Sequence, residues 1–173
     1  MEIIKYSNIG CREINQDCLA SLSFDHDKSI HIVADGIGGY DCGEIASKIV
    51  CESYIHGLVN NLSIDEVTKE VSKNIQERVK FNLENQLGIK AETVNVYVQN
   101  IKVVGETECR NLGFSKMGST VAAVVLNGLQ ASIFWAGDSR VYVFRDKHLL
   151  YQTEDHSLLN ELSRVRELSF DEK

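Results

Sequence analysis

A glycine-rich turn after an apolar run carries the first residues that could do chemistry. Asp35-Gly36-Ile37-Gly38-Gly39 directly follows the apolar stretch 30–34. Because glycine adopts backbone angles that are closed to other residues, the main chain can approach a ligand closely here, beside a carboxylate. This is the outline of a metal or phosphate site, and the same residues would equally make an ordinary tight turn between a strand and a helix.

Two further acids and an arginine could join this site. Gly137-Asp138-Ser139-Arg140 reads as a tight turn at the end of a strand, and Asp17 ends a polar stretch that contains Arg12. Hard divalent cations such as Mg²⁺ and Mn²⁺ take carboxylate, carbonyl and water oxygens, whereas the planar fork of an arginine suits a phosphate. Taken alone, Asp17 and Asp138 are also common turn formers.

Short runs rich in apolar residues predict the strands that would position these groups. In chain order, we expect strands over 3–6, 19–24, 30–34, 94–98, 120–126, 129–136, 141–145 and 148–151. Asn127-Gly128 suits the type I′ turn of a hairpin, and the strands after it would continue as an antiparallel meander.

Two helices are expected between these strands. Asp41 with Glu44 fits a capping box for a helix that runs to about Leu58, and Ser63 with Glu66 repeats the signature. The apolar residues of the second helix recur at steps of three and four: Ile64, Val67, Val71, Ile75 and Val79. This order predicts an α+β fold, with amphipathic helices packed on an antiparallel sheet.

Composition limits the classes of function. The 173 residues suit a single domain, 1–173, in which the segment 88–116 could be an inserted flap. The balance of 18 basic against 25 acidic residues, net −7, argues against binding to nucleic acid or to a membrane surface. The chain has no apolar stretch of membrane-spanning length and no signal-peptide layout at residue 1, so we expect a cytoplasmic protein.

The cysteines and histidines point to no further site. The five cysteines form no Cys-x-x-Cys pair and are expected to be reduced thiols, and the Cys-x₅-Arg loop of a cysteine phosphatase is absent. The five histidines lack ligand-like spacing and are expected at the surface or in packing. The turn at Gly36 also lacks the last glycine of a dinucleotide-binding fingerprint, since residue 41 is Asp.

Five blocks follow one another along the chain: Arg12-x-x-Asn15-Gln16-Asp17, Asp35-Gly36-Ile37-Gly38-Gly39 with Gly43-Glu44, Gly118-Ser119-Thr120, Gly137-Asp138-Ser139-Arg140 and Asp155-His156-Ser157. Taken together, they resemble a known family, the metal-dependent protein phosphatases of the 2C type, in their bacterial form. The resemblance spans nearly the whole chain. It implies an antiparallel β-sandwich flanked by helices, with a centre of two Mn²⁺ or Mg²⁺ ions at one end.

The resemblance also implies a role for each site residue. Asp35 would bridge the two metals, the Gly36 carbonyl would bind one of them, and Asp17 would hold a metal-bound water. Asp138 matches a residue that helps to bind a third ion, and Arg12 would grip the phosphate. The implied reaction is attack of a metal-activated water on phosphoserine or phosphothreonine in a protein substrate, within a serine/threonine kinase signalling pathway.

The largest departure from the family is at the C-terminus. Family members continue beyond the position of Asp171 into further strands that carry two more metal-binding aspartates, so the chain resembles a catalytic domain that is incomplete at its C-terminus. With fewer protein carboxylates, metal affinity is expected to fall and turnover to be weak or absent.

Local departures bear on the chemistry. Ile37 stands where eukaryotic relatives place a histidine proposed as the general acid, so the leaving group would be protonated by water. Tyr40 stands where bacterial relatives have histidine, and Gln16 replaces an acidic ligand. Two functions therefore stay open: a protein serine/threonine phosphatase, or a catalytically silent phosphatase-like module that binds or regulates a partner.

Overall fold

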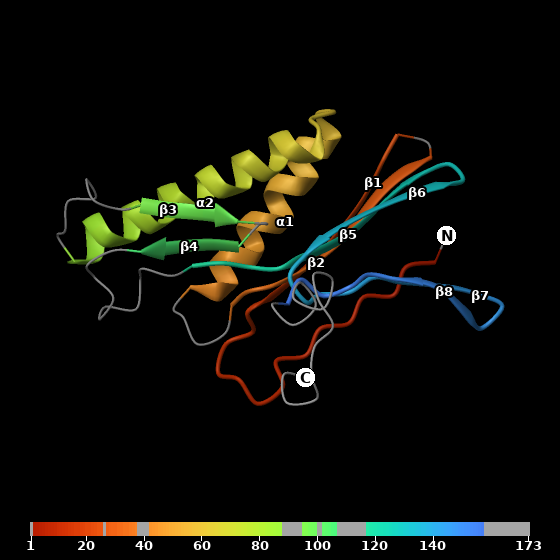
Figure 1. Cartoon of the computed structure of the whole chain (residues 1–173), viewed down its shortest axis with the longest axis horizontal. Helices are drawn as coiled ribbons and strands as arrows, with labels where there is room; N and C mark the ends of the chain where they lie inside the picture. The colour runs from red at the N-terminus through yellow and green to blue at the C-terminus, as the bar shows by residue number, and fades with distance from the viewer. Residues whose placement is uncertain are drawn as a thin grey trace, which may run out of the picture.

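The computed structural model describes residues 2–25, 27–37, 42–87, 95–99, 102–106 and 117–157, with the backbone alone over 79–87, 95–99 and 102–106. It has an α+β architecture of antiparallel sheets and two helices (Figure 1). The elements are β1 (Asp17–Phe24), β2 (Lys28–Asp35), α1 (Gly43–Val59), α2 (Ile64–Leu87), β3 (Asn95–Gln99), β4 (Lys102–Glu106), β5 (Val121–Asn127), β6 (Gln130–Ala136), β7 (Tyr142–Arg145) and β8 (His148–Gln152).

A four-stranded antiparallel sheet in the order β1-β2-β5-β6 is the centre of the fold. In β2, Ile30, Ile32 and Ala34 are buried on one face, as their alternation predicts, whereas Val33 is exposed on the other. Antiparallel pairing places Asp17 opposite Asp35, so β1 begins beside the residue at which β2 ends.

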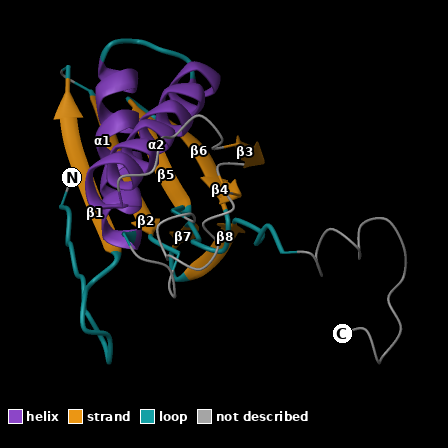
Figure 2. Ribbon diagram, turned by 90° about the vertical axis from the view of Figure 1, so that its left-hand side faces the viewer, coloured by secondary structure: helices purple, strands orange, loops and turns teal. Residues whose placement is uncertain are grey.

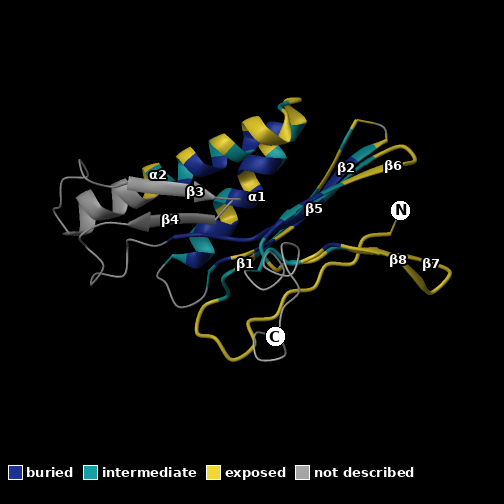
Figure 3. Cartoon of the chain, in the orientation of Figure 1, coloured by how far each residue is buried: buried dark blue, intermediate teal, exposed yellow. Residues whose placement is uncertain are grey.

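Both helices lie on the same side of this sheet, with α1 against β1 and β2 (Figures 1 and 2). The core between the layers contains the buried residues of β2 together with Val50 and Tyr54 of α1 and Val67 of α2. The Tyr54 ring lies 4.9 Å from that of Phe134 on β6, which ties the helix layer to the far strand of the sheet. Buried residues accordingly line the helix surfaces that face the strands (Figure 3).

The capping box predicted for α2 is confirmed. The Ser63 backbone N–H donates to a carboxylate oxygen of Glu66 at 2.8 Å, and the Glu66 N–H donates to Ser63 Oγ at 3.3 Å. Of the apolar face predicted for this helix, Val67, Val71 and Ile75 are buried, whereas Ile64 in the first turn is exposed. The side chain of Val79 lies outside the described part of the helix. A Cβ atom on Gly57 of α1 would lie 2.3 Å from a methyl group of Val67, so this glycine permits the close packing of the helices.

The predicted start of α1 is wrong in detail. The cap residue is Cys42, in the left-handed conformation (φ 73°) and without a side-chain capping bond, and the helix begins at Gly43. The Cys42 carbonyl accepts the N–H groups of Ile45 and Ala46 instead. Asp41, the predicted cap, lies outside the described residues.

The β5–β6 hairpin is confirmed, but its turn is not the predicted type I′. Asn127 pairs with Gln130, so the two loop residues are Gly128 and Leu129. Of these Gly128 alone has positive φ (57°), whereas a type I′ turn needs positive φ at both central residues. Leucine strongly disfavours that conformation, which explains the difference.

Two other strand predictions need correction. Residues 3–6 form no strand, and Ile4 is 86% exposed, because this segment has no hydrogen-bonded neighbour among the described strands. The last strands do not continue the meander, since β7 and β8 form a separate two-stranded sheet. The turn at Gly137 (φ 96°) redirects the chain between β6 and β7.

The segment 88–116 is described only in part. The strand expected over 94–98 is present as β3, and it pairs with β4, which the sequence did not predict. The remaining residues of this segment lie outside the described part, so the flap stays a prediction.

Candidate functional site

The site begins with two aspartates that face each other across paired strands. Asp17 opens β1 and Asp35 closes β2, and the register pairs them directly. Both residues are accessible to solvent, although the Asp35 carboxyl group is partly covered. The Asp17 N–H donates to Asn15 Oδ1 at 3.1 Å, and the Asn15 amide donates to Ser7 Oγ at 2.8 Å, so the turn before β1 is held by its own side chains.

The electrostatics of Asp35 bring the other predicted residues into the same site. Partial burial raises the pKa of Asp35, and the neighbouring Asp17 and Asp138 carboxylates raise it further, while the Arg12 guanidinium acts in the opposite direction. Asp17 is also close enough to hydrogen bond to Asp35 when one of the two is protonated. Arg12, Asp17 and Asp138 therefore all act electrostatically on Asp35, which lies at the strand ends where β1 begins and β2 finishes.

The start of β5 fixes the backbone of Asp35. The Asp35 N–H donates to Thr120 Oγ1 at 3.0 Å, and the Thr120 N–H donates back to the Asp35 carbonyl at 2.8 Å. Ser119 Oγ donates to the same carbonyl at 3.0 Å. Both Ser119 and Thr120 are buried. In the sequence these two residues stood out only as part of the family resemblance, without a predicted role. In the structure they position Asp35.

Gly36 lies where two segments cross at close range. Its N–H donates to the Gln16 carbonyl at 3.0 Å, and it forms a bridge with Ser119. A Cβ atom on Gly36 would lie 2.1 Å from the Gly43 carbonyl oxygen at the start of α1. The absence of a side chain at Gly36 therefore serves first to let the turn pack against the helix. Gly38, Gly39 and Tyr40 lie outside the described residues.

The turn that carries Asp138 is attached to β5 as well. A Cβ atom on Gly137 would lie 2.7 Å from the Thr120 methyl group, and Thr120 Oγ1 lies 2.5 Å from Ser139 Oγ. Thr120 thus contacts both acid-bearing turns, through Asp35 on one side and Ser139 on the other. This shared contact explains how the Asp35 and Asp138 turns lie close to each other, which the sequence led us to expect.

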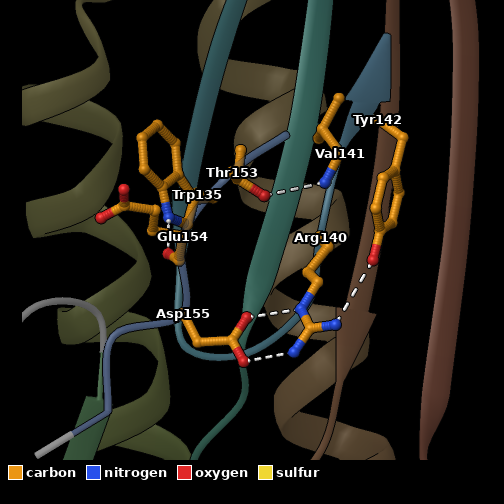
Figure 4. Close-up of polar contacts among 7 residues, drawn as sticks. All are labelled: Trp135, Arg140, Val141, Tyr142, Thr153, Glu154 and Asp155. Carbon is orange, nitrogen blue, oxygen red and sulfur yellow. Dashed lines mark hydrogen bonds and ion pairs between the residues drawn. The ribbon is translucent and has the colours of Figure 1, made fainter. Parts of the chain in front are cut away.

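The segment after β8 holds this turn from outside. Arg140 donates two hydrogen bonds of 2.6 Å to the Asp155 carboxylate and a third, of 3.3 Å, to Tyr142 Oη (Figure 4). The two bonds from Arg140 to the carboxylate lower the pKa of Asp155. The Val141 N–H donates to Thr153 Oγ1 at 2.9 Å, which adds a second connection between the same two segments.

His156 completes the support as a packing residue, in line with the expectation for the histidines. Its ring stacks on Trp135 with the centroids 5.6 Å apart, and its Nδ1 lies 3.3 Å from the Gly137 nitrogen. The Trp135 indole N–H donates to the Glu154 carbonyl at 2.7 Å (Figure 4). Asp155 and His156 therefore hold the Asp138 turn in place.

The donor set suits a hard divalent cation in its chemistry and is sparse in number. Asp17 and Asp35 offer carboxylate oxygens from adjacent strand ends, and their mutual repulsion is what a cation would relieve. Among residues 2–25, 27–37, 42–78 and 117–157, whose side chains the structure describes, no three His, Cys, Asp or Glu side chains lie close enough to hold a metal ion together. A cation here would thus keep several water ligands.

Comparison with known proteins places this geometry in context. The family description "Protein phosphatase 2C" matches residues 6–167. A putative protein phosphatase 2C-type of Streptococcus pyogenes is 33% identical over 175 residues, which cover 99% of this chain and 62% of the relative.

Solved structures share the fold. The serine/threonine phosphatase PstP/Ppp of Mycobacterium tuberculosis has a TM-score of 0.57 and 22% identity, over 93% of this chain and 57% of that one. A catalytic domain of the serine/threonine protein phosphatase PstP in complex with 2 manganese ions has a TM-score of 0.53 and 21% identity, over 93% of this chain and 58% of the other.

The chain spans little more than half the length of the curated relatives that it matches.

A separate observation concerns the helices: none of those in the described residues is long and apolar enough to cross a membrane.

Proposed function

Because the chain belongs to the protein phosphatase 2C family, we propose that it hydrolyses phosphoserine and phosphothreonine in proteins as a metal-dependent serine/threonine phosphatase. The observation that supports this most directly is the pairing of Asp17 with Asp35 at adjacent strand ends, with Asp138 and Arg12 within electrostatic range. Carboxylates beside an arginine can serve a cation and a phosphate at the same place.

The metal ligands we propose are Asp17, Asp35, the Gly36 carbonyl and Asp138. They would hold two Mn²⁺ or Mg²⁺ ions, with Asp138 serving a third, as the manganese-bound PstP domain suggests for the two. Bound there, such ions supply an activated water as the nucleophile. The residues of this chain position the site: Thr120 and Ser119 fix Asp35, and the Arg140–Asp155 pair fixes the turn of Asp138.

Arg12 is proposed to bind the phosphate. Its exposed side chain follows a turn in which the Arg12 N–H donates to the Ile9 carbonyl at 3.2 Å. The positive charge acts on Asp35 from this position. A guanidinium can donate two parallel hydrogen bonds to phosphate oxygens, which would both neutralise and orient the group under attack.

We propose a phosphorylated protein as the substrate, within a cytoplasmic serine/threonine kinase pathway. The chain would form a single domain, with the segment 88–116 as a flap that contributes to substrate choice. Neither nucleic acid nor a membrane is proposed as a partner, given the net charge of −7.

A second function is favoured by one observation. Since no three acidic, histidine or cysteine side chains among the described residues form a metal-binding group, the metal would be held weakly. Weak turnover is then expected from residues 1–173, and the limiting case is a catalytically silent module that binds phosphorylated partners.

The test is Mn²⁺-dependent release of phosphate from a phosphothreonine peptide by the full chain, with Mn²⁺ binding followed by calorimetry. Asp35→Asn should abolish both signals, whereas Asp146→Asn makes the same chemical change in the β7–β8 turn and should leave them unchanged. Turnover lost in Asp35→Asn would support the phosphatase. Peptide binding without turnover, unaffected by Asp35→Asn, would support the silent module.

A further inference from the structure

Two free cysteines meet where β1 packs against α1. Cys18 is the second residue of β1 and is half-buried, and Cys51 of α1 is only 1% exposed. Cys51 Sγ lies 3.6 Å from the Cys18 carbonyl oxygen. Both cysteines also line one groove between β1 and α1. Cys51 belongs to the buried core and Cys18 packs against that core, so this proximity is a property of the fold.

A groove gives access to the pair from outside. Its lining includes Cys18, Cys51 and Asp17, and it runs between β1 and α1 towards Val59. In the main sheet as described, β1 is an edge strand, so no other strand of that sheet covers this side. A small oxidant can therefore reach Cys18 first, while Cys51 lies deeper behind it.

We propose that Cys18 and Cys51 form an oxidation site, in which a peroxide converts the two thiols into a reversible disulfide that joins β1 to α1. In the first step the Cys18 sulfur attacks one peroxide oxygen, the O–O bond breaks, and water and a sulfenic acid result. In the second step the Cys51 sulfur attacks the sulfenic sulfur and displaces water. Two thiols are oxidised and one hydrogen peroxide is reduced to two waters.

The environment sets the order of these steps. Burial, with hydrogen bonding to Cys18, raises the pKa of the Cys51 thiol well above its usual range, so Cys51 is a poor first nucleophile. The half-buried Cys18 is the group that the oxidant meets. Cys51 is then held close enough to capture the sulfenic acid before further oxidation.

The bond would affect the segment next to the acids. It would close a chain separation of 33 residues and fix β1 at the residue that directly follows Asp17. Such a cross-link restricts the unfolded chain and is expected to raise the melting temperature. The inference does not depend on the proposed phosphatase activity, because its readouts are covalent and thermal.

The experiment treats the folded full chain with hydrogen peroxide, blocks remaining thiols with N-ethylmaleimide, and maps peptides by mass spectrometry without reduction. We expect one intramolecular cross-link, Cys18 to Cys51, that dithiothreitol reverses and that accompanies a melting temperature raised by several degrees. Oxidation in guanidinium chloride should instead give mixed pairings, because the fold no longer selects the partner.

Variants make the assignment specific. Cys18→Ser should remove both the cross-link and the thermal shift, and Cys11→Ser, a change at an exposed cysteine, should preserve both. Cys51→Ala should leave Cys18 as a sulfenic acid that dimedone traps. A folded wild-type protein whose Cys18 sulfenic acid persists unlinked, or in which Cys18 pairs with Cys11, Cys42 or Cys109, would overturn the proposal.

Discussion

Arg140 grips Asp155 through two parallel hydrogen bonds of 2.6 Å that join residues fifteen positions apart. Because Arg140 lies two residues after Asp138, this contact ties the acid-bearing turn to the segment after β8. The position of Asp138 thus depends on a side chain that itself has no place among the proposed metal ligands.

Replacing Arg140 with lysine tests this dependence. The charge stays, but the paired hydrogen bonds are lost, because an ammonium group cannot reproduce the planar fork. We expect a small fall in melting temperature and a larger loss of Mn²⁺-dependent phosphatase activity. Arg145→Lys, the same change on β7, is the control and should leave both values unchanged. Equal activity of the two variants would show that the Asp138 turn does not need Arg140.

The same pair predicts a pH dependence of stability. Hydrogen bonds from Arg140 lower the pKa of Asp155, and the charges of Arg140 and His156 act in the same direction. The ion pair therefore stabilises the fold above the unfolded-state pKa of about 4 and loses its effect as pH falls through the lower, folded-state pKa. The difference in melting temperature between wild type and Asp155→Asn should be largest near neutral pH and shrink in acid. A difference that is constant with pH would contradict the ion pair as its cause.

How far the sequence predicted the site depends on the range of the contacts involved. Local signals succeeded: the Ser63–Glu66 box needs only neighbours along the chain, and the alternation of Ile30, Ile32 and Ala34 follows from strand geometry. Residues 3–6 failed because a strand needs a partner, and sequence alone does not show whether one is present.

The residues that hold the site residues in place could not be predicted from the local sequence pattern. Thr120 contacts Asp35, 85 positions away, and also Ser139. A buried threonine at a strand start has no signature that distinguishes it from any other core threonine. The family resemblance marked the block, and only the three-dimensional structure gives it a task.

Replacing Gly36 is expected to cause a severe packing defect. In Gly36→Ala the new methyl group would lie 2.1 Å from the Gly43 carbonyl oxygen, so the turn or the start of α1 must shift. We expect a loss of about 1–3 kcal/mol in the free energy of unfolding, or more, by denaturant titration. Gly128→Asn is the control, since open space surrounds Gly128 and asparagine tolerates its positive φ. Equal stability of the two variants would refute the close approach.

The capping box gives a prediction remote from the site. Ser63→Ala removes the acceptor for the Glu66 N–H at the start of α2 and should cost about 1 kcal/mol of unfolding free energy. Ser132→Ala, at an exposed position on β6, should change stability little. The cap lies at the start of α2 and is remote from the proposed metal ligands. Mn²⁺ binding should therefore be the same in both variants. Weakened Mn²⁺ binding in Ser63→Ala would mean that α2 takes part in the site.

One substitution at the Asp17–Asp35 pair should have opposite effects on the melting temperature without and with a bound metal ion. Asp17→Asn removes a negative charge beside Asp35, so the metal-free protein should melt at a slightly higher temperature. A bound ion stabilises the fold in proportion to its affinity, so saturating Mn²⁺ should raise the melting temperature of the wild type more than that of the variant. Asp25→Asn, in the β1–β2 turn, controls for loss of surface charge. If Mn²⁺ shifted wild type and Asp17→Asn equally, the pair would not be part of the metal site, and its proximity would be a feature of strand pairing alone.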